Sequence, residues 1–378
     1  MAGKGYSRRD FVRTSAAAAA GAAAGMAASN LSAADKQKIL NYNENMEYRP
    51  WGKTGLMVSS VCLGGHWKRI DKVVPSCNKG RGGWLGFDIN DPGFQKNRRD
   101  VVSKCIEVGI NYIDACTTQE CRAYAKALEG RRDKMYFGFS WYQEEMRSLH
   151  NQMKKAEKAG KPKPAGWMTK KLLEALDKGM RMTGLEYVDL WRITMHEQSS
   201  KHSDAEVEEM MEALAKARKQ GKARFTGFSS HDRPHIKKLI EAYPDIVDSI
   251  VTPYTAKTKK MPGDSLFDTL AKQKVGFFGI KPFSSNRLFK GDSTPDHAEA
   301  DADDRRARLA IRFILCNPVI TGPIPGMINT HQVENVARAV AERRQLDVAE
   351  AKELEEAMDE AWTKLGPDYE WLRDWEYV

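Results

Sequence analysis

The chain has 378 residues, of which 41% are hydrophobic and 29% charged, and its formal net charge is +9. This length can bury one large core, and a single α/β barrel of roughly 250 to 320 residues with appendages would fill it. The first thirty residues carry +3 of the charge, which leaves a modest +6 for the rest. Because the sequence lacks a basic helix with interleaved aromatic residues, this charge argues against nucleic-acid binding.

The first thirty residues indicate an export signal. The pair Arg8-Arg9, within the run from Ser7 to Arg13, resembles a twin-arginine motif and precedes an Ala-rich stretch at 15–28. That stretch is too short and too weakly apolar to span a bilayer stably. We expect residues 1–30 to be a twin-arginine signal peptide that uses the twin-arginine export machinery, and the mature chain to be periplasmic or otherwise exported. The alternative is a disordered tail with a chance arginine pair.

Six cysteines show neither a C-x-x-C pair nor the spacing of an iron–sulfur cluster, and they are Cys62, Cys77, Cys105, Cys116, Cys121 and Cys316. Cys116 and Cys121 could form a disulfide after export. Burial as small free thiols is the alternative, and folding in a reducing compartment favours it.

Short apolar runs alternate with helical patterns from residue 59 onward, the order expected of βα units and a parallel sheet. Eight runs are candidate strands: 59–63, 111–114, 135–139, 187–193, 224–228, 247–251, 276–280 and 319–323. Between them, stretches such as 206–219 place apolar residues three and four apart, as helices packed on a barrel do.

Several segments resemble the aldo-keto reductases in that family's order: YVDLW at 187–191, GKARFTGFS at 221–229, Lys281-Pro282, and IPGMINTHQVEN at 324–335. The resemblance implies an α/β fold, a (β/α)8 TIM barrel with an N-terminal hairpin and a C-terminal helical extension. It divides the chain into a linker at 31–45, a barrel at 46–345, and a C-terminal helix and tail at 346–378. Long connections at 67–97 and 150–166 should cover the carboxyl face, the second as a solvated loop.

The family's hydride-transfer site uses an Asp, a Tyr, a Lys and a His, and the sequence leaves the Asp, Asp114, almost alone. The Tyr position falls on Gln119 or Thr117, the Lys position on Ser140, and the His position on Thr194. In the family the Tyr supplies a proton to the developing alkoxide. These replacements therefore predict an atypical proton donor.

His196 lies two residues past the family's His position, and an imidazole titrates in the range needed to donate a proton. We predict His196 as the proton donor beside Asp114. Lys281 and His231 are placed to meet anionic groups of a small substrate, such as a carbonyl compound or a sugar. Tyr142 is a weaker substitute donor, and a hydrogen-bonded bystander is the alternative for His196.

The resemblance also implies NADP or NAD as cofactor, with the adenine end better kept than the nicotinamide end. At the nicotinamide end the family's Asn, Gln and stacking aromatic become Ser230, Val251 and Ile280. His331 takes the place of an Arg that binds the 2′-phosphate, so the choice of coenzyme stays open. The predicted cofactor-binding residues are Ser229, Ser230, Pro282, Phe283, Gly326, Met327, Gln332, Glu334 and Asn335.

Three functions remain open at this point. The first is an exported NAD(P)-dependent oxidoreductase with an atypical proton donor. The second is an inactive barrel that binds a ligand or a protein. The third is a metal-dependent enzyme that uses a carboxyl-face cluster of His66, Asp114, His196, Glu197, His231 and Asp232.

Overall fold

The computed structural model describes residues 32–79, 87–258, 264–342, 344–367 and 370. The predicted signal peptide at 1–30 lies outside the described residues. Within the described part, no helix combines the length and apolar character needed to cross a bilayer.

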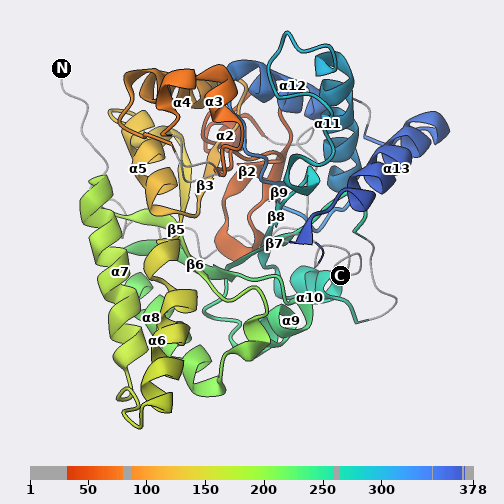
Figure 1. Cartoon of the computed structure of the whole chain (residues 1–378). Helices are drawn as coiled ribbons and strands as arrows, with labels where there is room; N and C mark the ends of the chain where they lie inside the picture. The colour runs from red at the N-terminus through yellow and green to blue at the C-terminus, as the bar shows by residue number, and fades with distance from the viewer. Residues whose placement is uncertain (1–31, 80–86, 259–263, 343, 368–369, 371–378) are drawn as a thin grey trace.

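A seven-stranded parallel sheet forms the centre of the molecule, with its strands in sequential order. Helices surround these strands (Figure 1), as expected of a barrel built from βα units. The strands are β3 (Tyr112–Ala115), β4 (Tyr136–Phe139), β5 (Val188–Thr194), β6 (Ala223–Ser229), β7 (Ser249–Pro253), β8 (Gly276–Ile280) and β9 (Gly322–Pro323).

The candidate strand at 59–63 is not a full strand of this sheet, which corrects the expected count of eight. It joins the two edges through two backbone hydrogen bonds on each side instead. Leu63 donates to the carbonyl of Tyr112 (2.9 Å) and accepts from the N–H of Asp114 (2.8 Å), while Cys62 and Gly64 donate to the carbonyls of Pro323 (3.0 Å) and Pro325 (2.8 Å). Because Pro325 has no N–H to donate back to this segment, a longer ladder cannot form on the edge next to β9. The seven strands and this segment fit an α/β barrel.

The expected N-terminal hairpin is present as β1 (Tyr48–Pro50) and β2 (Met57–Ser59), paired antiparallel. Between the strands, Trp51 is fully buried inside the barrel. Its ring packs edge-on against Tyr112 (centroids 5.3 Å apart) and Phe278 (5.7 Å). The hairpin therefore closes the end of the barrel opposite the carboxyl ends of the strands.

After the short helix α2, helices alternate with the strands along the chain. They are α2 (Ala33–Lys36), α3 (Ile70–Val73), α4 (Pro92–Glu107), α5 (Thr118–Ala127), α6 (Met146–Lys158), α7 (Trp167–Thr183), α8 (Asp204–Lys219), α9 (Arg233–Ala242), α10 (Leu266–Gln273), α11 (Ala300–Leu315), α12 (Thr330–Ala341) and α13 (Val348–Thr363). The last is the expected C-terminal helix.

The segment 150–166 is not the solvated loop expected from its lysines, because helix α6 takes up its first half. Met146 and Leu149 are buried and Met153 is partly buried, at spacings of three and four residues. This apolar stripe packs on the core and leaves the lysines on the solvent face, which is how an amphipathic helix is held.

Candidate active site

A cavity of about 1020 Å³ lies at the carboxyl ends of the strands. The residues that line it include all four predicted catalytic residues: Asp114, His196, His231 and Lys281. The lining also includes five of the predicted cofactor-binding residues: Ser229, Ser230, Pro282, Phe283 and Gly326. We call this space the barrel-mouth cavity.

Asp114 is not alone in this cavity, which corrects the picture drawn from the sequence. Arg192 of β5 donates from Nε to Oδ1 of Asp114 (2.7 Å) and from a terminal nitrogen to Oδ2 (2.5 Å). Both side chains are almost completely buried, with 2% and 5% exposed. Burial lowers the pKa of Arg192, but the Asp114 carboxylate outweighs burial and holds that pKa well above its ordinary value. Arg192 is therefore a fixed cation in the cavity.

Ser140 and Thr194, which the sequence predicts at the family's Lys and His positions, contact each other. Their hydroxyl oxygens lie 2.7 Å apart. Ser140 Oγ also donates to the buried carboxylate of Glu145 (2.5 Å), which accepts from the backbone N–H of Thr194 (2.9 Å) and of Trp141 (2.6 Å). Burial raises the pKa of Glu145. Ser140 and Thr194 thus form one hydrogen-bonded cluster around a single carboxylate.

The two candidate Tyr positions lie outside the lining of the barrel-mouth cavity. Thr117 and Gln119 are not among the residues that line the barrel-mouth cavity. The hydroxyl of Tyr112 lies 3.5 Å from Oδ1 of Asp114, but the ring is packed inside the barrel, and burial raises the pKa of Tyr112 well above its ordinary value. Tyr142 does line the cavity.

His196 lies at the start of the loop after β5, with 22% of its side chain exposed. Its Nδ1 accepts a hydrogen bond from the backbone N–H of Gln198 (3.1 Å). An imidazole nitrogen that accepts carries no proton, so the proton of the neutral ring lies on Nε2. The backbone N–H of His196 donates to Nε2 of His202 (3.2 Å).

The two predicted anion-binding residues differ in charge. Burial holds the pKa of His231 well below its ordinary value, and the nearby cations Lys281 and Arg233 lower it further. His231 is therefore neutral near pH 7. Lys281 directly follows β8 in a left-handed conformation with φ of 59°, which is uncommon for a residue with a side chain.

The predicted carboxyl-face metal cluster does not assemble. Asp114 pairs with Arg192, His66 pairs with Glu120 at 2.9 Å, and Asp232 caps α9. Among the described residues, the group whose ligand atoms lie close together is a different one, formed by His150, His202 and Glu206.

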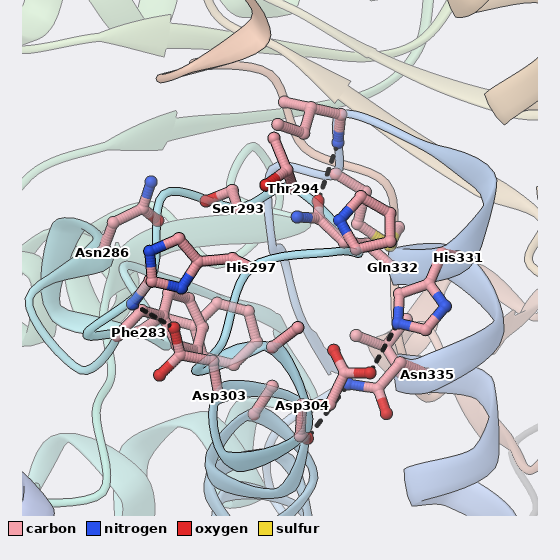
Figure 2. Close-up of a pocket in the computed structure, with 18 of the residues that line it drawn as sticks. Phe283, Asn286, Ser293, Thr294, His297, Asp303, Asp304, His331, Gln332 and Asn335 are labelled. Atoms are coloured by element: carbon pink, nitrogen blue, oxygen red, sulfur yellow. Dashed lines mark hydrogen bonds and ion pairs between the residues drawn. The ribbon is translucent and has the colours of Figure 1, made fainter. Parts of the chain in front are cut away.

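A second pocket lies beside the first, over the N-terminal ends of α11 and α12 (Figure 2). Four residues line both spaces: Lys68, Phe283, Asn286 and Gly326. Three further predicted cofactor residues line this pocket: Met327, Gln332 and Asn335. We call it the α11–α12 pocket. The two spaces therefore meet.

Protein contacts hold the polar groups of the α11–α12 pocket. His331 Nε2 lies 2.5 Å from Asp304 Oδ2, and the side-chain amide of Asn335 donates to the backbone carbonyl of Asp304 (3.0 Å). Glu334 does not line the pocket, because its carboxylate pairs with Lys104 of α4 at 2.9 Å. Glu334, predicted as a cofactor-binding residue, thus points away from the pocket.

All six cysteines are free thiols, so the possible bridge between Cys116 and Cys121 does not form. Cys121 is buried, with its sulfur 3.2 Å from the carbonyl of Ser140. Cys116 lines the barrel-mouth cavity, and burial raises its pKa to about 11.

The aldo/keto reductase family model matches residues 82–359. The chain therefore belongs to the aldo/keto reductase family, whose members are oxidoreductases. It is 24% identical over 251 residues to the L-glyceraldehyde 3-phosphate reductase of Escherichia coli K12, covering 64% of this chain and 63% of that protein. It is also 24% identical over 161 residues to an uncharacterized oxidoreductase of Schizosaccharomyces pombe, covering 42% of this chain and 50% of that one.

Solved structures agree on the fold. The holo form of an aldo-keto reductase from Bacillus halodurans superposes with a TM-score of 0.53 at 20% identity, covering 82% of this chain and 96% of that one. An aldo/keto reductase from Brucella melitensis gives a TM-score of 0.52 at 14% identity, covering 82% and 97%. At these identities the likeness concerns the fold alone.

Proposed function

We propose that this chain is an exported, nicotinamide-dinucleotide-dependent oxidoreductase that reduces a small carbonyl compound, with His196 as its proton donor. The meeting of the two cavities carries this proposal. One contains the Asp114–Arg192 pair and the other most of the predicted adenine-end residues, so together they offer an extended dinucleotide a continuous path. The α11–α12 pocket, about 70 Å³ as it stands, must widen to take the adenine half. Lys68 lines both, where a cation suits a pyrophosphate.

Both spaces contain residues that can contact such a cofactor, while the family's amide and aromatic contacts at the nicotinamide end are replaced. Ser229 and the apolar Val251 and Ile280 line the barrel-mouth cavity and would hold the nicotinamide half. Gly326 and Asn335 line the α11–α12 pocket and would hold the adenine half. When bound, the dinucleotide supplies the hydride.

The chain's own groups divide the remaining work. Arg192 is a fixed cation and stabilises negative charge that develops on the substrate oxygen, but its raised pKa prevents it from donating a proton. His196 acts as the imidazolium, which donates its Nε2 proton to that oxygen and becomes a neutral imidazole. Lys281 attracts anionic groups of the substrate, while the neutral His231 offers a hydrogen bond.

The pairing of His331 with Asp304 in the α11–α12 pocket supports a preference for NAD over NADP. In the family an Arg binds the 2′-phosphate, and here that position is His331, whose ring pairs with Asp304. A carboxylate repels a phosphate and accepts a hydrogen bond from a hydroxyl. We therefore propose NADH as the preferred reductant.

Two measurements on the purified protein test this function together. NADH and NADPH are titrated while the fluorescence of the barrel's tryptophans is followed, and turnover is assayed with small aldehydes and ketones, with and without a carboxylate or phosphate group. Binding with turnover supports the proposal. Binding without turnover supports the inactive ligand-binding barrel instead. If neither coenzyme binds, a nicotinamide cofactor is excluded for the oxidoreductase and for the ligand-binding barrel alike.

Export is proposed from the sequence of the leader. Its test is a fusion of residues 1–30 to a reporter that is active only after export in the folded state. Replacing Arg8 and Arg9 together by Lys should abolish the signal, because the twin-arginine route reads that pair. Unchanged export of the double variant would contradict the assignment.

A further inference from the structure

A second polar centre lies where α6 meets α8, in residues that do not line the barrel-mouth cavity. It is formed by His150 of α6, His202 at the end of a short 3-10 turn, and Glu206 of α8. Their side chains are 10%, 0% and 3% exposed. We propose that these three side chains bind one divalent transition-metal ion, with zinc as the best fit.

The set of donor atoms suits zinc. Two imidazoles and one carboxylate form a common set of protein ligands for this ion and leave a coordination position for water. Within the described residues, this is the group whose candidate ligand atoms all lie within 4.8 Å of one another.

Local sequence explains why two of the ligands converge. Ser203 caps α8, and its backbone N–H donates to Oε2 of Glu206 (2.7 Å) in a capping box. His202 precedes the cap and lies four residues before Glu206, which places both side chains at the N-terminal end of α8. His150 then reaches across from α6, with Nδ1 2.7 Å from Oε1 of Glu206.

One atom in this centre points to a missing ligand. Nδ1 of His202 is buried and has no hydrogen-bond partner in the described part of the chain. It faces Oε2 of Glu206 at 3.7 Å, which is too long for a hydrogen bond. An ion with ligand bonds of about 2.0–2.2 Å would bridge that gap, because it would bind both atoms at once.

Metal binding has a defined consequence for the neighbouring loop. As the structure stands, Nε2 of His202 accepts from the backbone N–H of His196, so the ring proton lies on Nδ1. A metal on Nδ1 moves that proton to Nε2 and breaks the 3.2 Å hydrogen bond. Loading the site therefore shifts the backbone at residue 196.

The proposed site would join three segments that are far apart in the sequence. It would tie α6, which Figure 1 shows on the outside of the barrel beside α8, to the loop that carries the proposed proton donor. The role we infer is positional: the ion holds α6 and the His196 loop in one arrangement.

The test measures zinc binding alone, with no coenzyme, so its outcome is independent of the proposed oxidoreductase activity. The purified full chain is stripped with a chelator, titrated with ZnCl2 by calorimetry, and assayed for zinc after gel filtration. We expect one equivalent of bound zinc and a rise of the melting temperature by a few degrees, because the ion binds the folded state.

Two variants and one control make the test specific. Glu206→Gln keeps a residue that can complete the capping box but loses the charged ligand, and His202→Asn loses the buried imidazole. Each should weaken zinc binding by about tenfold or more. His297→Asn changes a histidine outside the centre and should bind zinc as the parent does.

Three outcomes would overturn the proposal. In the first, the parent keeps far less than one equivalent of zinc after gel filtration. In the second, Glu206→Gln and His202→Asn, shown to be folded by circular dichroism, bind zinc as tightly as the parent does. In the third, His297→Asn loses zinc binding to the same extent as the other two variants.

Discussion

The barrel-mouth cavity and the α11–α12 pocket hold their charges in different ways. At the mouth, Asp114 and Arg192 are 5% and 2% exposed and joined by two hydrogen bonds. In the pocket, His331 and Asp304 are 48% and 22% exposed. The charge proposed to stabilise the reacting oxygen is thus part of the core, whereas the pair proposed to select the coenzyme lies near solvent. Changes at the mouth should therefore affect folding, while changes in the pocket should affect selectivity.

The largest effect is expected from Arg192→Met, which leaves the buried carboxylate of Asp114 without its cation. Breaking a buried ion pair on one side costs about 3–5 kcal/mol of unfolding free energy. Urea denaturation measures it. The solvent-facing pair Arg305–Glu353 offers a matched control, since Arg305→Met should cost at most about 1 kcal/mol.

A double variant sharpens this result. Arg192→Met combined with Asp114→Asn should recover part of the lost stability, because the uncompensated charge is gone. If Arg192→Met were no less stable than Arg305→Met, the contrast between the two regions would fail.

The next effect concerns turnover. His196→Ala should lower the rate of carbonyl reduction by about a hundredfold or more, the usual loss when a general acid is removed. Steady-state kinetics at saturating NADH measure it. His235→Ala is the control, since His235 bonds to Ser199 and is not among the cavity-lining residues. An unchanged rate in His196→Ala would remove that residue from the mechanism.

A smaller change is expected in the α11–α12 pocket. The double variant Asp304→Asn and His331→Arg removes a carboxylate and adds a fixed cation, so it should shift the ratio of NADH to NADPH affinities towards NADPH by about tenfold, or about 1.4 kcal/mol. Titrations with both coenzymes give the ratio directly. The unfolding free energy should change little, and a large loss of stability would contradict the solvent-facing character of this pair.

The smallest effect is a pH dependence of stability. Burial holds the pKa of His231 well below its ordinary value, so the folded state keeps it neutral while the unfolded state takes up a proton below about pH 6.5. Stability should therefore fall as the pH drops below that value. When the melting temperatures of the parent and of His231→Gln are plotted against pH, the two plots should converge or cross on acidification. Parallel curves would show that His231 does not contribute.

The sequence predicted the barrel better than the contents of its mouth. Apolar runs located all seven strands of the sheet, because strand periodicity is a local property. The remaining run, 59–63, has the same apolar character. It forms no ladder with the segment after β9, because Pro325 has no N–H to donate. The sequence did not predict helix α6, because the lysines of 150–166 indicated a solvated loop. Two of the three apolar residues of its buried stripe, Met146 and Leu149, precede that segment.

Arg192 illustrates what the sequence could not predict in the barrel-mouth cavity. The sequence did indicate a buried ion pair. An arginine inside a buried strand requires a partner, and Asp114 lies on another buried strand. Which charges meet depends on strand order and register, which one sequence does not state. The centre of His150, His202 and Glu206 is similar: the spacing of the last two was visible, but His150 comes from a separate helix.

The six thiols have a consequence for life outside a reducing compartment. Sulfur reacts with oxidants as the thiolate, and burial raises the pKa of Cys62, Cys77, Cys105, Cys116 and Cys121. Once folded, these five sulfurs stay protonated and resist peroxide and disulfide exchange. A chain exported already folded would thus carry these five cysteines into oxidising surroundings without needing a partner to repair mispaired bonds, and would leave only Cys316 exposed among the six.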